Sequence, residues 1–160
     1  MTAIATPHGL AEIRGMFGDP WKFILTDGTL SPQWEAENII RVPLPAPLPF
    51  EGTQVTRVTC HTKLATIFPA TLQKIFAAGL WPKLHSYGGG FQFRPMRGLS
   101  SLSLHTWGIA WDFDPEHNLL GTHGTMDTSI VNIFERDGFM WGGHFTGRKD
   151  PMHFQWATGY

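Results

Sequence analysis

The segment 109–114, Ile-Ala-Trp-Asp-Phe-Asp, places two carboxylates among large apolar side chains. Side chains alternate between the two faces of a β-strand, so Asp112 and Asp114 share one face while Trp111 and Phe113 occupy the other. A buried carboxylate is unstable unless it is paired with, or bound to, a cation. The segment therefore predicts a strand with one apolar face for the core and, if the other face is buried, a need for a cation there.

The composition is typical of one globular domain. The chain has 160 residues, of which 42% are hydrophobic and 16% charged, with a net charge of −1. No basic run favours nucleic acid or an anionic membrane surface as a partner, and no apolar run approaches the roughly 18 residues that span a bilayer. The single cysteine, Cys60, excludes an intramolecular disulfide and thiolate zinc sites. We expect a single domain over residues 1–160, monomeric, with no nucleic-acid or membrane partner.

Apolar spacing predicts three helices. The first follows an N-cap at Thr6, with a proline at its first position, and covers 7–18. The second starts from Thr62, ends near Gly79 and is expected to kink or restart at Pro69, because proline cannot donate within a helix. A third, shorter helix is expected around 130–134.

The remaining segments predict short extended structure. Prolines at every second position of 42–50 deny a strand its donors, so we expect a polyproline-like strap there. Short extended segments are expected at 89–94, 108–114, 138–141 and 152–156. Strands and helices that do not alternate regularly favour an α+β fold, a small antiparallel sheet flanked by helices.

Histidines and aspartates recur beside glycines and prolines in three pieces of the C-terminal half, 103–114, 141–144 and 150–155. Imidazole nitrogens and carboxylate oxygens are the ligands of catalytic zinc sites, which leave one position for water. His105 and Asp112 would lie on opposite faces of one straight strand, so they converge only if the chain turns near Gly108.

Asp150 precedes His153 by three residues, and Pro151 stiffens the turn between them. A carboxylate placed there can take a proton from a water that zinc has acidified, during attack on an amide. Each of these residues alone is more often a surface or turn residue. Together they indicate a metal-dependent amidohydrolase with two histidines and one aspartate on zinc and a further carboxylate as base; other divalent ions are an alternative to zinc.

The pattern S-x-H-x-W-G-x-A-x-D-x-D-P-x-x-N over 103–118, followed by W-G-G and D-P-M-H-F-Q, resembles a family of zinc peptidoglycan peptidases. These are the D-alanyl-D-alanine carboxypeptidases and L-alanyl-D-glutamate endopeptidases, which include phage endolysins. The resemblance implies the fold of that family and assigns His105, Asp112 and His153 as zinc ligands. It also assigns Asp150 as the catalytic carboxylate, where many relatives have glutamate.

The family resemblance also implies an oxyanion-stabilising arginine upstream of the first histidine. Arg94 and Arg97 are both candidates, and we favour Arg94 because it follows the strand-like Gly-Phe-Gln-Phe. Ser103 is expected to orient the ligand loop or contact substrate. His123 and His144 are candidate substrate contacts; a solvated loop is the alternative for His123, and relatives often carry an acidic residue in place of His144.

The resemblance implies hydrolysis of a peptide bond in the stem peptide of bacterial peptidoglycan, with the L-alanyl-D-glutamate bond as our first expectation. The alternatives are a D-Ala-D-Ala carboxypeptidase with the same site, and a non-catalytic peptidoglycan-binding or virion structural module that keeps zinc for its fold. The first residues lack the basic start and apolar core of a secretory signal. We therefore expect a protein made in the host cytoplasm that acts on the cell wall after release. The resemblance implies a phage or prophage setting.

Overall fold

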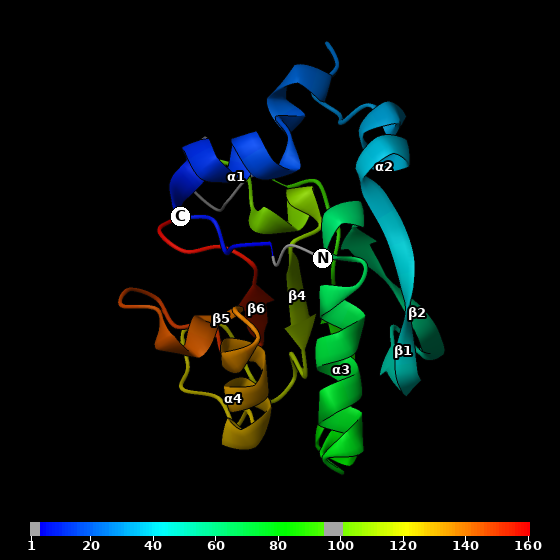
Figure 1. Ribbon diagram of the computed structural model, residues 1–160, viewed down its shortest axis with the longest axis vertical. Coiled ribbons are helices and arrows are strands. Elements are labelled where there is room, and N and C mark those ends of the chain that lie inside the picture. The colour runs from blue at the N-terminus through cyan, green and yellow to red at the C-terminus, as the bar shows by residue number, and fades with distance from the viewer. Residues whose placement is uncertain (1–3, 95–100) are drawn as a thin grey trace.

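A four-stranded antiparallel sheet of order β3–β4–β6–β5 forms the centre of the computed structural model, which describes residues 4–94 and 101–160. Its strands are β3 (Tyr87–Gly89), β4 (Ala110–Phe113), β5 (Met140–Trp141) and β6 (His153–Gln155). A separate antiparallel hairpin pairs β1 (Ile39–Phe50) with β2 (Thr53–His61). The helices are α1 (Gly9–Phe17), α2 (Pro32–Asn38), α3 (Ile67–Ala77) and α4 (Thr128–Arg136). The architecture is α+β, as predicted (Figure 1).

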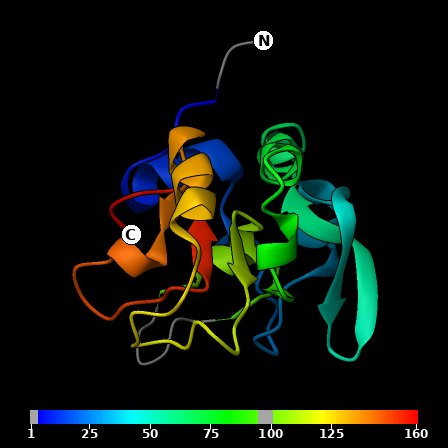
Figure 2. The ribbon, with the colours of Figure 1, turned by 90° about the horizontal axis from the view of Figure 1, so that it is seen from below.

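The central sheet has an apolar side and a polar side. Figure 2 shows α3 and α4 on one side of this sheet and loop segments on the other. Trp111 of β4 stacks on Phe68 of α3, and Phe154 of β6 stacks on Phe134 of α4, with ring centroids 3.8 Å and 4.2 Å apart. Because side chains alternate along a strand, Asp112 and its neighbours across the sheet face the loop side. The strand predicted from the alternation at 109–114 is confirmed as β4.

The first helix begins later than predicted. Its N-cap is His8 and its first residue is Gly9, so the predicted N-cap at Thr6 is wrong. Thr6 instead donates its hydroxyl to a backbone carbonyl, and the carbonyl of Pro7 accepts the N–H of Thr158 at 2.9 Å. This pairing with the C-terminal segment holds the chain extended up to His8.

The proline-rich segment 42–50 is a strand, so the prediction of a polyproline-like strap is wrong. It forms most of β1 and pairs with β2, with a shift in register between Pro43 and Leu48. Alternate residues of a strand direct their N–H groups to the same edge. The four alternating prolines therefore remove donors from one edge only, and the other edge remains able to pair with β2.

Residues 90–94 form no strand, contrary to the extended segment predicted at 89–94. Their backbone donors are used elsewhere: the N–H of Phe91 donates to Thr59 Oγ1 at 2.9 Å, and that of Gln92 donates to the carbonyl of His105 at 3.1 Å. The chain therefore leaves the sheet after Gly89 and runs between β2 and the loop that holds His105.

The other helix predictions hold. Helix α3 starts afresh at Ile67 after a short 3-10 turn at Thr62–Leu64, and Pro69 lies in its first turn, where a helix needs no N–H donor. Helix α4 covers the third predicted segment. No helix in the described part of the chain has the length and hydropathy needed to cross a bilayer.

His61, at the end of β2, is 1% exposed and joins three segments. Its Nδ1 accepts the N–H of Lys63 at 3.1 Å, and its Nε2 donates to the carbonyl of Phe17 at 3.2 Å. Burial lowers the pKa of His61 from 6.5 to about 4. Protonation of Nδ1 would also remove the acceptor that Lys63 uses.

Because the unfolded histidine binds a proton more tightly than the folded one, His61 favours unfolding as the pH falls from 6.5 towards 4. The variant His61→Asn keeps a side-chain acceptor for the Lys63 N–H but cannot titrate. We expect it to be less stable at pH 7 and to lose about 2–3 kcal/mol less than the wild type between pH 7 and pH 4, measured by urea unfolding. The exposed control His123→Asn should keep the wild-type pH dependence. A pH dependence of His61→Asn equal to that of the wild type would contradict this role.

Candidate metal centre

Three buried residues, His105, Asp112 and His153, converge on the loop side of the central sheet, and each residue is less than 10% exposed. One ligand atom from each lies within 4.8 Å of the others. Asp112 and His153 are directly opposite each other on the antiparallel strands β4 and β6, so their side chains share one face. The Asp112 carboxylate lies 3.4 Å from His105 Nε2 and 3.0 Å from His153 Nδ1. The structure thus brings together the three residues that the sequence predicts as ligands.

The turn required between His105 and Asp112 is made by Gly108. His105 lies in a short 3-10 helix, Leu104–Trp107, and Gly108 ends it in the left-handed conformation with φ of 68°. A Cβ at Gly108 would also lie 2.6 Å from the Cδ1 atom of Ile39. Both its conformation and its close contact with β1 therefore require glycine at this position.

Hydrogen bonds fix the orientation of both histidine rings. His105 Nδ1 donates to the carbonyl of Gly90 at 2.7 Å, and His153 Nε2 donates to Gln155 Oε1 at 3.0 Å. The Gln155 amide is itself oriented, because its Nε2 donates to the carbonyl of Ala157 at 2.9 Å. Each ring therefore directs its unprotonated nitrogen towards the carboxylate between the two rings, as metal-binding histidines do.

The convergence of these acceptors favours a cation at their centre. His105 Nε2 is buried and forms no hydrogen bond with the described residues. Burial raises the pKa of Asp112, but the closeness of the His105 and His153 rings outweighs that effect and keeps this pKa well below its usual range. Burial lowers the pKa of His153, and Asp112 outweighs that effect and raises it. Two imidazoles and one carboxylate, all held in place, match the donor set of a zinc-type divalent ion.

Asp150 lies beside these ligands on a tight turn. Its carbonyl accepts the N–H of His153 at 3.0 Å, and its own N–H donates to Gly142 at 3.0 Å. A Cβ at Gly142 would lie 2.3 Å from the Asp150 carbonyl oxygen, so the Trp-Gly-Gly motif permits this approach. Asp150 Oδ1 is buried and has no hydrogen-bond partner in the described part of the chain, and burial raises the pKa of Asp150. This carboxylate therefore binds a proton more readily than an exposed aspartate does.

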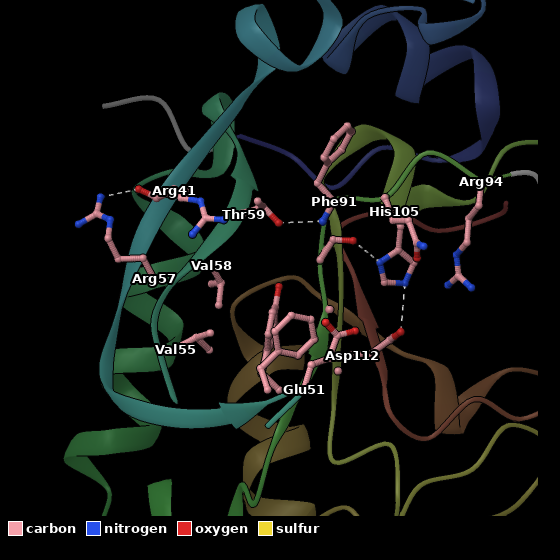
Figure 3. Close-up of a pocket in the computed structure, with 16 residues that line it drawn as sticks. Arg41, Glu51, Val55, Arg57, Val58, Thr59, Phe91, Arg94, His105 and Asp112 are labelled. Carbon is pink, nitrogen blue, oxygen red and sulfur yellow. Dashed lines mark hydrogen bonds and ion pairs between the residues drawn. The ribbon is translucent and has the colours of Figure 1, made fainter. Parts of the chain in front are cut away.

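Two cavities reach the three ligands from different sides. One, of about 480 Å³, lies between the β1–β2 hairpin and residues 87–92 and includes His105 and Asp112 (Figure 3). The other, of about 700 Å³, includes Asp112, Asp150 and His153. The candidate metal centre therefore lies where the two cavities meet.

Two of the other predicted site residues lie beside this centre. Arg94 lines both cavities, and its charge opposes the effect of burial on the pKa of Asp150 by lowering it. In Figure 3 the Arg94 side chain lies beside His105. Ser103 caps the 3-10 helix by accepting the N–H of His105 at 3.4 Å, and it lines the larger cavity. Arg97, the other arginine candidate, falls outside the described residues.

The structure does not bring His123 or His144 to the centre. His144 is exposed and pairs with Glu135 of α4, with its Nδ1 atom 2.7 Å from Glu135 Oε1. His123 lies in an exposed loop. Neither lines the two cavities around the centre.

The second aspartate of the 109–114 segment needs no cation. Asp114 follows β4 with a positive φ of 50°, and its Oδ1 accepts the N–H groups of His85 and Ser86 at 2.5 and 2.6 Å. Backbone donors thus stabilise this charge, so the inference that both carboxylates need a cation is wrong for Asp114.

Sequence reasoning missed Gln155, although a signal for it was present. Gln155 lies two residues after His153 on β6 and therefore on the same face. The final glutamine of the D-P-M-H-F-Q motif is the residue that fixes the His153 ring.

We expect the protein to bind one zinc ion per chain after chelator treatment, measured by isothermal titration calorimetry. Asp112→Asn should weaken binding by about 100-fold or more, because it removes a charged ligand, and Gln155→Leu should weaken it by about 10- to 100-fold, because it frees the His153 ring. His144→Asn serves as the matched control and should bind as the wild type does. Undiminished zinc binding by Asp112→Asn would contradict the centre described here.

A family model described as D-alanyl-D-alanine carboxypeptidase matches residues 97–156. No curated protein matches the chain. The matched segment includes all three converging residues and Asp150, and it ends one residue beyond Gln155. Residues 97–156, which build most of this centre, are thus similar to the D-alanyl-D-alanine carboxypeptidase family.

Proposed function

We propose that the protein is a zinc-dependent peptidase that cleaves the stem peptide of bacterial peptidoglycan, and that the bond it cleaves is L-alanyl-D-glutamate. One observation carries the proposal: three buried ligand groups converge beside a buried carboxylate oxygen that has no partner in the described part of the chain, within the segment that matches the peptidase family. A ligand cluster alone would support a structural metal site. The adjacent Asp150 supplies the proton-transfer group that hydrolysis requires.

His105, Asp112 and His153 are the residues that would hold the zinc ion. Zinc, when bound, acidifies water and polarises a carbonyl group. Asp150 can accept a proton at Oδ1, which has no hydrogen-bond partner among the described residues, and can return it to the leaving amine, because burial raises its pKa. Arg94 places a positive charge beside the centre, where negative charge develops on the carbonyl oxygen.

The two cavities favour an endopeptidase over a carboxypeptidase. A carboxypeptidase needs only a short site for the terminal residue on the leaving side of the bond. Here cavities of about 480 and 700 Å³ meet at the centre, which gives room for peptide on both sides of the bond. D-Ala-D-Ala carboxypeptidase activity remains the second candidate, favoured by the description of the matching family.

The setting we propose is that of a phage or prophage endolysin, a monomer made in the host cytoplasm that acts on the wall after release. The support for it is the resemblance of the motifs over 103–118 and 150–155 to a family that includes phage endolysins.

The variant Asp150→Asn tests the enzymatic role. We expect it to bind zinc as the wild type does, since Asp150 is outside the ligand cluster, and to lose hydrolysis of purified sacculi by about 10²- to 10⁴-fold. The measurement is the release of soluble muropeptides, with His144→Asn as the active control. If wild type and variant both bind sacculi and neither cleaves them, the protein is a non-catalytic binding or structural module.

Mass spectrometry of digested muropeptides identifies the bond. The proposal predicts new peptides that begin with D-glutamate, and it predicts that a chelator abolishes them and added zinc restores them. Loss of a single terminal alanine instead would identify a carboxypeptidase. Digestion that persists in a chelator and in metal-free protein would contradict a zinc-dependent reaction.

A further inference from the structure

The smaller cavity is a cleft that leads from the candidate metal centre along the β1–β2 hairpin (Figure 3). The hairpin forms one wall, and β3 with residues 90–92 forms the other. His105 and Asp112 are at one end of the cleft. A peptide whose scissile bond lies at the centre can therefore extend into this cleft.

The walls of the cleft are tied together by direct contacts. The Phe50 ring, at the end of β1, packs on the Tyr87 ring of β3 with centroids 5.2 Å apart. Thr59 of β2 accepts the N–H of Phe91 through its hydroxyl, and its carbonyl accepts Trp111 Nε1 at 2.9 Å. These contacts set the width of the cleft before any ligand binds. Binding therefore costs little free energy for ordering the walls of the cleft.

The charged side chains that line the cleft comprise three arginines and two acids, Arg41, Arg57, Arg94, Glu51 and Asp112. Asp112 is engaged with the two histidines of the centre, and Arg94 lies beside that centre. Arg57 donates from its guanidinium to the carbonyl of Arg41 at 2.6 Å, which holds it along the hairpin. Of these three arginines, Arg41 is the one whose guanidinium has no role assigned above.

The side chain of Arg41 is directed into the cleft. Figure 3 shows it extending from β1 towards Thr59, while Arg57 points away from the centre. In the described part of the chain, neither Arg41 nor Glu51 forms an ion pair. Burial raises the pKa of Tyr87. The positive charge of Arg41 lies close enough to lower this pKa and so opposes the effect of burial.

We propose that this cleft is an anion subsite in which the guanidinium of Arg41 binds a free carboxylate of the peptide substrate. The inference rests on the proposed function, because it takes a stem peptide as the ligand. A guanidinium pairs with a carboxylate through two parallel hydrogen bonds, which an amide in place of the carboxylate cannot match. Arg41 is therefore a specificity residue that selects stem peptides with free rather than amidated carboxylates.

The test is a binding measurement on zinc-loaded Asp150→Asn protein, which is expected to hold the peptide without cleaving it. Two synthetic stem peptides are compared by calorimetry, one with free carboxylates and one with the same carboxylates amidated. We expect Arg41→Gln, made in this background, to weaken binding of the free-carboxylate peptide by about tenfold and to leave binding of the amidated peptide unchanged. Arg136→Gln, on an exposed position of α4, is the matched control and should alter neither affinity.

The outcomes separate the subsite from the peptidase. An equal effect of Arg41→Gln on both peptides, or no effect on either, overturns the subsite. Cleavage of sacculi by the wild type, measured in parallel, decides the peptidase proposal on its own. If the wild type fails to cleave but binding still depends on Arg41 and the free carboxylate, the peptidase proposal fails and the anion subsite stands.

Discussion

A buried carboxylate held between two imidazoles is the interaction on which the rest of this structure depends. Asp112 lies between His105 and His153, whose other nitrogens already donate to Gly90 and Gln155. Because those nitrogens are the donors, the nitrogens that face Asp112 are acceptors, and a cation would stabilise such a buried group of acceptors.

The alternation of β4 and β6 allows this polar centre to lie directly against an aromatic core. Trp111 and Phe154 pack on the side covered by α3 and α4, while Asp112 and His153 face the loops. The same rigid pair of strands therefore stabilises the fold and orients two of the ligands. Gly108 then returns the chain so that the third ligand reaches the same point.

Short-range signals in the sequence predicted several elements around the centre, whereas the family resemblance assigned its three ligands. The period of two at 109–114 predicted β4, and the spacing around Gly108 required the turn that the structure contains. What the sequence could not supply were pairings between distant segments. The C-terminal segment pairs with the residues just before α1, and β2 pairs with the proline-containing strand β1. The same limit applies to Arg41, because local spacing does not show that the hairpin borders the centre.

X-ray absorption at the zinc edge of the zinc-loaded protein tests the convergence of the three residues most directly, since it reports the atoms bound to the ion. Coordination by His105, Asp112 and His153 predicts two imidazole nitrogens and carboxylate or water oxygen at about 2.0–2.2 Å, with the multiple scattering that imidazole rings produce. The imidazole signal should fall by half in His153→Ala. A shell of oxygen atoms alone, or a spectrum that this substitution does not alter, would contradict the centre described here.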